Sequence, residues 1–148
     1  MLHRILIPLF VTLFTADLKG QDIFKHRWEN RLLLVLSKEY SDIKLTEQLS
    51  VLNNCKQGLT ERKLLVYQIL PDKYKISTTY GNEETWQLSP VLYEQFSAAD
   101  TPFEIILIGL DGGIKLRKED QLACEELWAV IDKMPMRQAE IRRQNNSK

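Results

Sequence analysis

The chain has 148 residues, of which 44% are hydrophobic and 27% are charged. This composition is that of one globular domain with a buried core, and it excludes general disorder. The 20 basic and 20 acidic residues cancel, so no overall field draws the protein to nucleic acid or to a charged membrane, and we expect neither as a partner.

The first 20 residues have the pattern of a secretory signal peptide. His3 and Arg4 give a basic start, residues 5–14 are apolar at all positions but one, and a polar stretch ends at Gly20. A membrane-spanning helix takes about 20 apolar residues, so this stretch is short for one. We expect a signal peptide at residues 1–20, a secreted or periplasmic protein, and no membrane span after signal removal. An uncleaved anchor or a buried N-terminal helix is the alternative.

The first half of the remaining chain predicts a strand, a helix and a second strand. Residues 31–37 contain five consecutive aliphatic side chains, which is typical of a central strand buried on both faces. Asp42 offers an N-cap, and leucines at helical spacing predict a helix that runs to about Cys55. The glycine at position 58 is expected to terminate this helix. Residues 63–70 predict the second strand.

Residues 74–86 are polar and carry a Tyr80-Gly81-Asn82 turn signal, which predicts a loop. Ser89 and Pro90 then predict the start of a short helix, with the serine as N-cap and the proline at the first position.

The second half predicts a hairpin and a last helix. Residues 103–110, which are apolar apart from Glu104, predict a third strand, and the Asp-Gly-Gly turn at 111–113 leads tightly into a fourth strand at 114–117. Asp120 is expected to cap the last helix, which carries an apolar stripe and is interrupted by Pro135.

These elements predict one α/β domain over residues 21–142, followed by a polar tail at 143–148. A right-handed crossover makes the first two strands parallel, and the hairpin makes the last two antiparallel. A four-stranded mixed sheet with strand order 2-1-3-4 and helices on both faces satisfies both constraints, and this arrangement resembles thioredoxin. Pro102 then lies where thioredoxin-fold proteins keep a cis-proline, so both isomers of its peptide bond stay open.

The thiol chemistry of that fold is missing from its usual place. It needs a thiolate in the first turn of the first helix, where the helix dipole lowers the thiol pKa, but residues 38–43 contain no sulfur. Cys55 and Cys124 are expected near opposite ends of the sheet, beyond the roughly 7 Å between Cα atoms that a disulfide allows. Two buried thiols are favoured, while a disulfide or a reactive Cys124 stays open.

The sequence also lacks the residues that a metal site or a serine hydrolase site requires. His26 is the only histidine after the expected signal peptide, so neither a zinc site with about four ligands nor a serine–histidine relay finds its partners. We expect no metal and no cofactor.

Three segments, residues 24–31, 107–115 and 131–140, resemble domain-of-unknown-function family 4174. The resemblance covers about residues 22–142. It implies a thioredoxin-like domain without established catalytic residues. The family occurs alone in bacterial exported proteins and within vertebrate extracellular proteins, such as sushi-repeat-containing proteins and coiled-coil-domain-containing protein 80, which are linked to matrix and adhesion.

The closing segment of this resemblance supplies the candidate binding residues Met134, Pro135, Met136, Arg137 and Glu140. Two flexible methionines beside a proline, with a cation and an anion three residues apart, suit a contact surface for an unknown protein or glycan outside the cytoplasm. In the alternative, structural interpretation, the first methionine packs in the core, the proline ends the helix and the two charges form a local ion pair.

The sequence therefore favours an exported, redox-silent thioredoxin-like binding or interaction module and leaves enzymatic activity open. The alternative is a peroxiredoxin-related redox enzyme or accessory in which Cys124 reacts and Cys55 or a partner thiol resolves it. A small-ligand binder that uses a cleft between Tyr40 and Pro102 is a third hypothesis.

Overall fold

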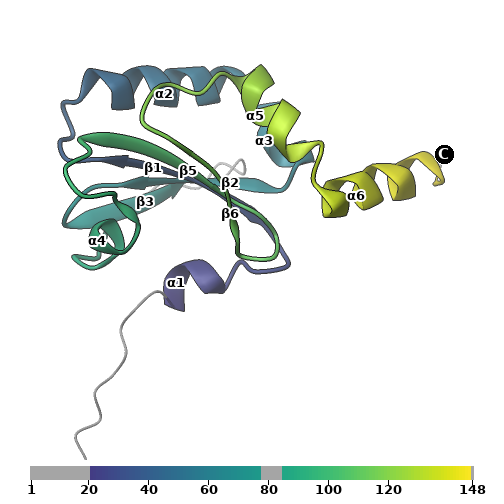
Figure 1. The fold of residues 1–148 in the computed structure, drawn as a ribbon, viewed down its shortest axis with the longest axis horizontal. Coiled ribbons are helices and arrows are strands. Elements are labelled where there is room, and N and C mark those ends of the chain that lie inside the picture. The colour runs from purple at the N-terminus through teal and green to yellow at the C-terminus, as the bar shows by residue number, and fades with distance from the viewer. Residues whose placement is uncertain (1–20, 78–84, 148) are drawn as a thin grey trace, which may run out of the picture.

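A computed structural model describes residues 21–77 and 85–147 (Figure 1). The expected signal peptide and the turn signal at 80–82 lie outside these residues. The six strands form one mixed sheet in the order β4-β3-β2-β1-β5-β6. Their bounds are β1 Arg31–Ser37, β2 Leu64–Ile69, β3 Lys73–Ser77, β4 Gln87–Leu88, β5 Phe103–Ile108 and β6 Ile114–Lys118. The helices are α1 Gln21–Phe24, α2 Ile43–Asn54, α3 Lys56–Glu61, α4 Leu92–Phe96, α5 Cys124–Ile131 and α6 Pro135–Asn145.

The centre of the sheet follows the sequence prediction. All seven residues of β1 are buried, and the strand pairs in parallel with β2 and antiparallel with β5. The predicted order 2-1-3-4 is found as β2-β1-β5-β6. The prediction of only four strands is wrong, because β3 and β4 extend the sheet beyond β2.

Strand β3 occupies part of the segment that the sequence predicted to be a loop. Its five residues alternate, so that Tyr74 and Ile76 point to one face while lysines and a serine point to the other. Tyr74 is buried and its ring stacks on that of Tyr67 at 5.7 Å between centroids. A strand with one apolar face and only two apolar residues gives too short an alternation to be separated from a polar loop.

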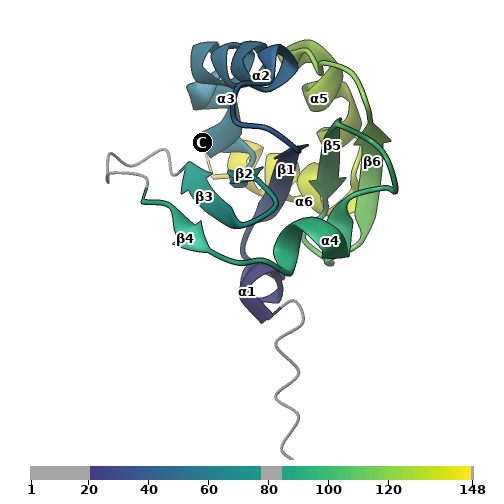
Figure 2. The ribbon, with the colours of Figure 1, turned by 90° about the vertical axis from the view of Figure 1, so that its left-hand side faces the viewer.

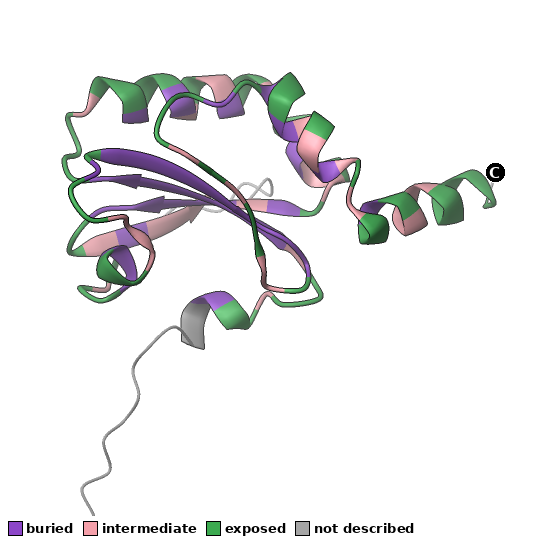
Figure 3. Ribbon diagram, in the orientation of Figure 1, coloured by how far each residue is buried: buried purple, intermediate pink, exposed green. Residues whose placement is uncertain are grey.

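Helices cover both faces of the sheet, as predicted, and each face has its own core (Figure 2). On one face α2, α3 and α5 contribute Leu45, Leu59 and Leu127 to the cluster that includes Leu33 of β1. On the other face α1 and α4 contribute to the cluster that includes Leu34. Figure 3 shows the buried residues running along the central strands, while α6 is largely exposed or half-buried. Because successive side chains of β1 point to opposite faces of the sheet, this strand contributes to both cores.

Helix α2 begins as predicted and ends earlier than predicted. Asp42 is its N-cap, and a carboxylate oxygen accepts a hydrogen bond of 2.9 Å from the backbone N–H of Lys44. The helix stops at Asn54, and α3 follows at once with Gly58 inside it. Gly58 is required for close approach, because a Cβ atom there would lie 2.5 Å from a ring carbon of Trp128 on α5.

Two further predictions are corrected and one open choice is settled. Helix α4 starts at Leu92 with Val91 as N-cap, so the cap predicted at Ser89 is wrong. The last helix does not start at Asp120; α5 starts at Cys124 with Ala123 as N-cap. The peptide bond before Pro102 is trans.

Substitution of Gly58 by alanine tests the contact between α3 and α5. We expect the free energy of unfolding to fall by about 1–2 kcal/mol, because overpacking costs about 1–3 kcal/mol and the gain in helix propensity is at most about 1 kcal/mol. Chemical denaturation measures the change. In a Trp128→Leu background the same substitution should be neutral or stabilising, and stabilisation by Gly58→Ala alone would contradict the contact.

Candidate functional site

The first turn of α2, where the sequence predicted no thiol chemistry, is a closed polar cluster. The hydroxyl oxygen of buried Ser37 lies 2.9 Å from the Glu39 carbonyl oxygen and 3.0 Å from a carboxylate oxygen of Asp42. The backbone N–H of Glu39 donates to the same hydroxyl at 3.3 Å. These groups satisfy one another, and no thiol lies at this end of the helix among the described residues.

The cleft proposed between Tyr40 and Pro102 is bridged by backbone. The N–H of Lys38 donates to the Pro102 carbonyl at 2.9 Å, which ties the two loops together. Tyr40 is exposed and meets the Trp86 ring edge-on at 6.2 Å between centroids. This surface therefore carries an aromatic pair beside the backbone bridge.

The connection from β6 to α5 runs alongside α2 in the same direction. Lys44 and Asp120 form an ion pair of 2.6 Å near the start of α2. One turn on, the fully buried Gln48 exchanges two hydrogen bonds with the backbone of Leu122, at 3.0 and 2.8 Å. The sulfur of Cys124 then lies 3.6 Å from the Val51 carbonyl oxygen. Successive residues of the connection therefore contact successive turns of α2.

This path brings the two cysteines together. Cys55 and Cys124 form a disulfide, with 6.6 Å between their Cα atoms and a sequence separation of 69 residues. The prediction that they lie too far apart is wrong. It started the last helix at Asp120, whereas the residues from 120 to 123 are not helical and carry the chain along α2 until α5 begins at Cys124. Neither cysteine of the described chain is a free thiol.

The predicted binding segment lies at the start of α6. Met134 is its N-cap and Pro135 occupies its first position. Met136 is 41% exposed, whereas the side chain of Arg137 is only 7% exposed. Arg137 and Glu140 form the expected ion pair at 3.2 Å, so the structure brings these two together and separates them from the outward-facing methionine.

That pair belongs to a larger network around the start of β1. Glu140 also accepts hydrogen bonds of 3.3 Å from Arg31, whose side chain is fully buried. Arg31 donates to the Arg62 carbonyl at 2.8 Å, and Arg137 donates to the Glu61 carbonyl at 3.0 Å. Helix α6 has no apolar stripe, and Arg137 is its only buried residue among those described. Charge therefore anchors this helix to the domain.

Asp132 joins the network to α5. It accepts two hydrogen bonds from Arg62, at 3.0 and 2.7 Å, and one of 3.3 Å from Arg137. Burial alone would raise the pKa of Asp132, but the hydrogen bonds and charges of the two arginines outweigh it and hold the pKa below the ordinary value. The guanidinium of Arg62 also lies 4.3 Å from the centre of the Trp128 ring.

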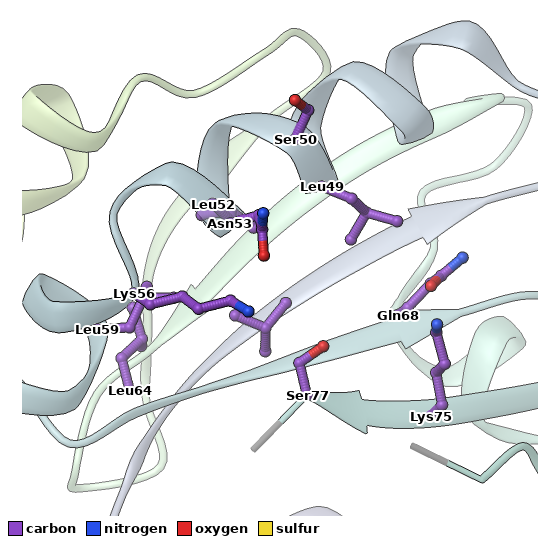
Figure 4. A pocket seen from close by; sticks show the side chains of 11 residues that line it. Leu49, Ser50, Leu52, Asn53, Lys56, Leu59, Leu64, Gln68, Lys75 and Ser77 are labelled. Carbon is purple, nitrogen blue, oxygen red and sulfur yellow. The ribbon is translucent and has the colours of Figure 1, made fainter. Parts of the chain in front are cut away.

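Sequence reasoning missed a pocket of about 370 Å³ between α2–α3 and β2–β3 (Figure 4). Its polar lining includes Lys56 of α3, Gln68 of β2 and Lys75 of β3. The signal was the alternation in residues 73–77, which places polar side chains on the helix-covered face of the sheet. Because the sequence predicted that segment to be a loop, it did not place these polar side chains on one face of the sheet.

No group of three or more His, Cys, Asp or Glu side chains within residues 21–77 and 85–147 is arranged to hold a metal ion. Within the same ranges, every helix is too short or too polar to cross a bilayer.

Comparison with known proteins gives a family and a fold. The family model described as "Domain of unknown function (DUF4174)" matches residues 22–140. No curated protein sequence matches the chain. Among solved structures, the reduced 2-Cys peroxiredoxin of Plasmodium vivax is similar with a TM-score of 0.56 and 12% identity, over 79% of this chain and 84% of that one. At this identity the likeness shows a thioredoxin-like fold and nothing of the chemistry.

Removal of the disulfide should destabilise the domain strongly. A cross-link that closes a loop of 69 residues restricts the unfolded chain and is worth about 4 kcal/mol. We expect the Cys55→Ser/Cys124→Ser variant to lose about this much free energy of unfolding in chemical denaturation. Wild-type protein unfolded in excess dithiothreitol should match the variant, and an unchanged midpoint on reduction would contradict the disulfide.

The network around Asp132 predicts a dependence of stability on pH. Because the folded-state pKa of Asp132 is lowered, its contribution is present above the unfolded-state pKa of about 4 and is lost as the pH falls through the folded-state pKa. The free energy of unfolding of Asp132→Asn should therefore fall less steeply than that of wild type below about pH 4. Exposed Asp72→Asn is the control; equal slopes for wild type and Asp132→Asn would contradict the prediction.

Proposed function

Since the chain belongs to the DUF4174 family, whose function is unknown, we propose that it is a redox-silent binding module that works outside the cytoplasm on a disulfide-linked thioredoxin-like scaffold. The observation that carries this proposal is the location of the sulfur. Both cysteines are joined at the C-terminal end of α2. The N-terminal end, where a helix dipole activates a thiol, instead holds a serine hydroxyl and the Asp42 carboxylate, which bond to one another and to backbone.

The location outside the cytoplasm rests on the sequence pattern of residues 1–20 and is consistent with the cysteines. Structural disulfides persist in oxidising compartments and are rare in the cytosol. A bond that joins α2 to α5 across 69 residues serves a domain that must stay folded without chaperones or reductants. This is the use that we assign to Cys55 and Cys124.

Within this proposal, the binding role of residues 134–140 falls on their exposed part. Pro135 and Met136 face solvent, while Arg137 and Glu140 hold α6 to the domain. Arg142 and Arg143 in the last turns of α6 add positive charge next to this surface. An acidic protein or glycan outside the cytoplasm suits such a surface by charge.

The second candidate function is the peroxiredoxin-related one, and the disulfide itself is the observation that favours it. If the pair were reduced, its two thiols would pass two electrons and two protons to one hydrogen peroxide, giving the disulfide and two water molecules. A dithiol or a partner protein would then have to reduce the disulfide in each cycle.

A peroxidase assay separates the two functions. With dithiothreitol as reductant, we expect wild type and the Cys55→Ser/Cys124→Ser variant to consume hydrogen peroxide at the same rate as buffer with dithiothreitol. The same two proteins should not accelerate the reduction of insulin by dithiothreitol. Catalytic turnover in wild type that disappears in the double variant would overturn the proposal and establish the redox alternative.

A further inference from the structure

The pocket between α2–α3 and β2–β3 has an apolar side and a polar side. Its apolar side is formed by Leu49 and Leu52 of α2, Leu59 of α3, and Leu64 and Val66 of β2. These residues belong to the core cluster on this face of the sheet or pack against it. A volume of about 370 Å³ lies within the range of small-molecule sites, which runs from about 300 to 1,000 Å³.

The strand register places the polar side opposite these leucines. Gln68 pairs with Lys75 and Val66 pairs with Ser77 across the β2–β3 ladder, so directly opposed side chains share a face. Figure 4 shows the ammonium of Lys56 reaching across the pocket from α3 toward the side where Gln68, Lys75 and Ser77 stand. Three elements thus direct polar groups into one space.

Gln68 has a buried oxygen that none of the residues described by the structure satisfies. The residue is 2% exposed, and its Oε1 atom has no hydrogen-bond partner within residues 21–77 and 85–147. Buried side-chain oxygens in native proteins almost always accept a hydrogen bond from protein, water or ligand. Because this residue lines the pocket, a rotation of its side-chain amide would bring this oxygen to a donor that enters the pocket.

The two lysines make the pocket complementary to negative charge. Lys56 and Lys75 line it from different elements, and no Asp or Glu is among its described lining residues. The ammonium of Lys75 also lies 5.3 Å from the centre of the Trp86 ring. The described lining of this apolar hollow therefore carries two basic side chains and no acidic one.

We infer that this pocket binds a small amphipathic anion. The apolar body lies on the leucine side, the anionic group lies between Lys56 and Lys75, and an N–H or O–H donor of the ligand bonds to Oε1 of Gln68. The inference deepens the proposed function by naming a ligand class, and it depends on the proposal only in that the domain binds. The state of the cysteines does not enter it.

Three probes that differ by one group each test the three contacts. N-octanoylglycine carries an apolar chain, an amide N–H and a carboxylate; its methyl ester lacks the charge, and N-octanoylsarcosine lacks the N–H. By isothermal titration calorimetry we expect N-octanoylglycine to bind the purified protein, the ester to bind at least about tenfold more weakly, and the sarcosine compound to bind several-fold more weakly. Amide chemical shifts should change in α2, α3, β2 and β3.

Variants assign each effect to its residue. Lys56→Gln/Lys75→Gln should weaken binding of N-octanoylglycine at least about tenfold and change binding of the ester little. The matched control, Lys118→Gln/Lys133→Gln, removes the same charge away from the pocket and should leave the affinity unchanged. In Gln68→Leu, N-octanoylglycine and N-octanoylsarcosine should bind with equal affinity. The melting temperature of this variant should be unchanged, so that the loss of discrimination is not caused by partial unfolding.

Several results would overturn the inference. These are equal affinities for acid and ester, an equal loss of affinity in the control pair of lysines, chemical-shift changes confined to other parts of the chain, or no binding of N-octanoylglycine at millimolar concentration. None of them would make the protein a peroxidase, and peroxidase turnover would not explain binding at this pocket. The two proposals therefore fail separately.

Discussion

The structure depends on one strand that is buried on both faces. Seven consecutive residues of β1 have no access to solvent, so the chain must supply a layer of helices on each side and a neighbouring strand on each edge. α2, α3 and α5 cover one face, and α1 and α4 cover the other. Even the first residue of the strand, Arg31, is fully buried, and its charge determines where Glu140 and α6 must lie.

The cysteines and the charge network hold two segments with few buried apolar side chains, the connection into α5 and helix α6. The connection into α5 crosses one end of the molecule with few apolar side chains, and it is held by the exchange between Gln48 and Leu122 and by the disulfide. Helix α6 has no apolar face and is held by arginines and carboxylates. Removing one partner of such a buried pair leaves a charge unsatisfied and destabilises more than the pair itself stabilises.

A thioredoxin-like scaffold without its thiols leaves other surfaces for function. The added strand β3 widens the sheet past β2, and its outward lysine and serine face the helix layer beside Gln68. A fold does not determine a function, and here the pocket lies between the helix layer and β2–β3, away from the N-terminus of α2. The domain combines a rigid core with a hollow whose polar atoms are not all satisfied, which is a property of binding sites.

The sequence by itself determined the centre of this protein, because local patterns carry that information. Aliphatic runs predicted β1, β2 and β5, the Asp-Gly-Gly turn predicted the hairpin, and Asp42 predicted the start of α2. Tertiary structure decided what depends on position across the chain. The distance between Cys55 and Cys124 follows from the connection at residues 119–123, which runs along α2 without forming a helical turn, and the pocket follows from the register of β3. Neither is visible locally, because a non-helical connection and a short, half-polar strand have the same composition as a loop.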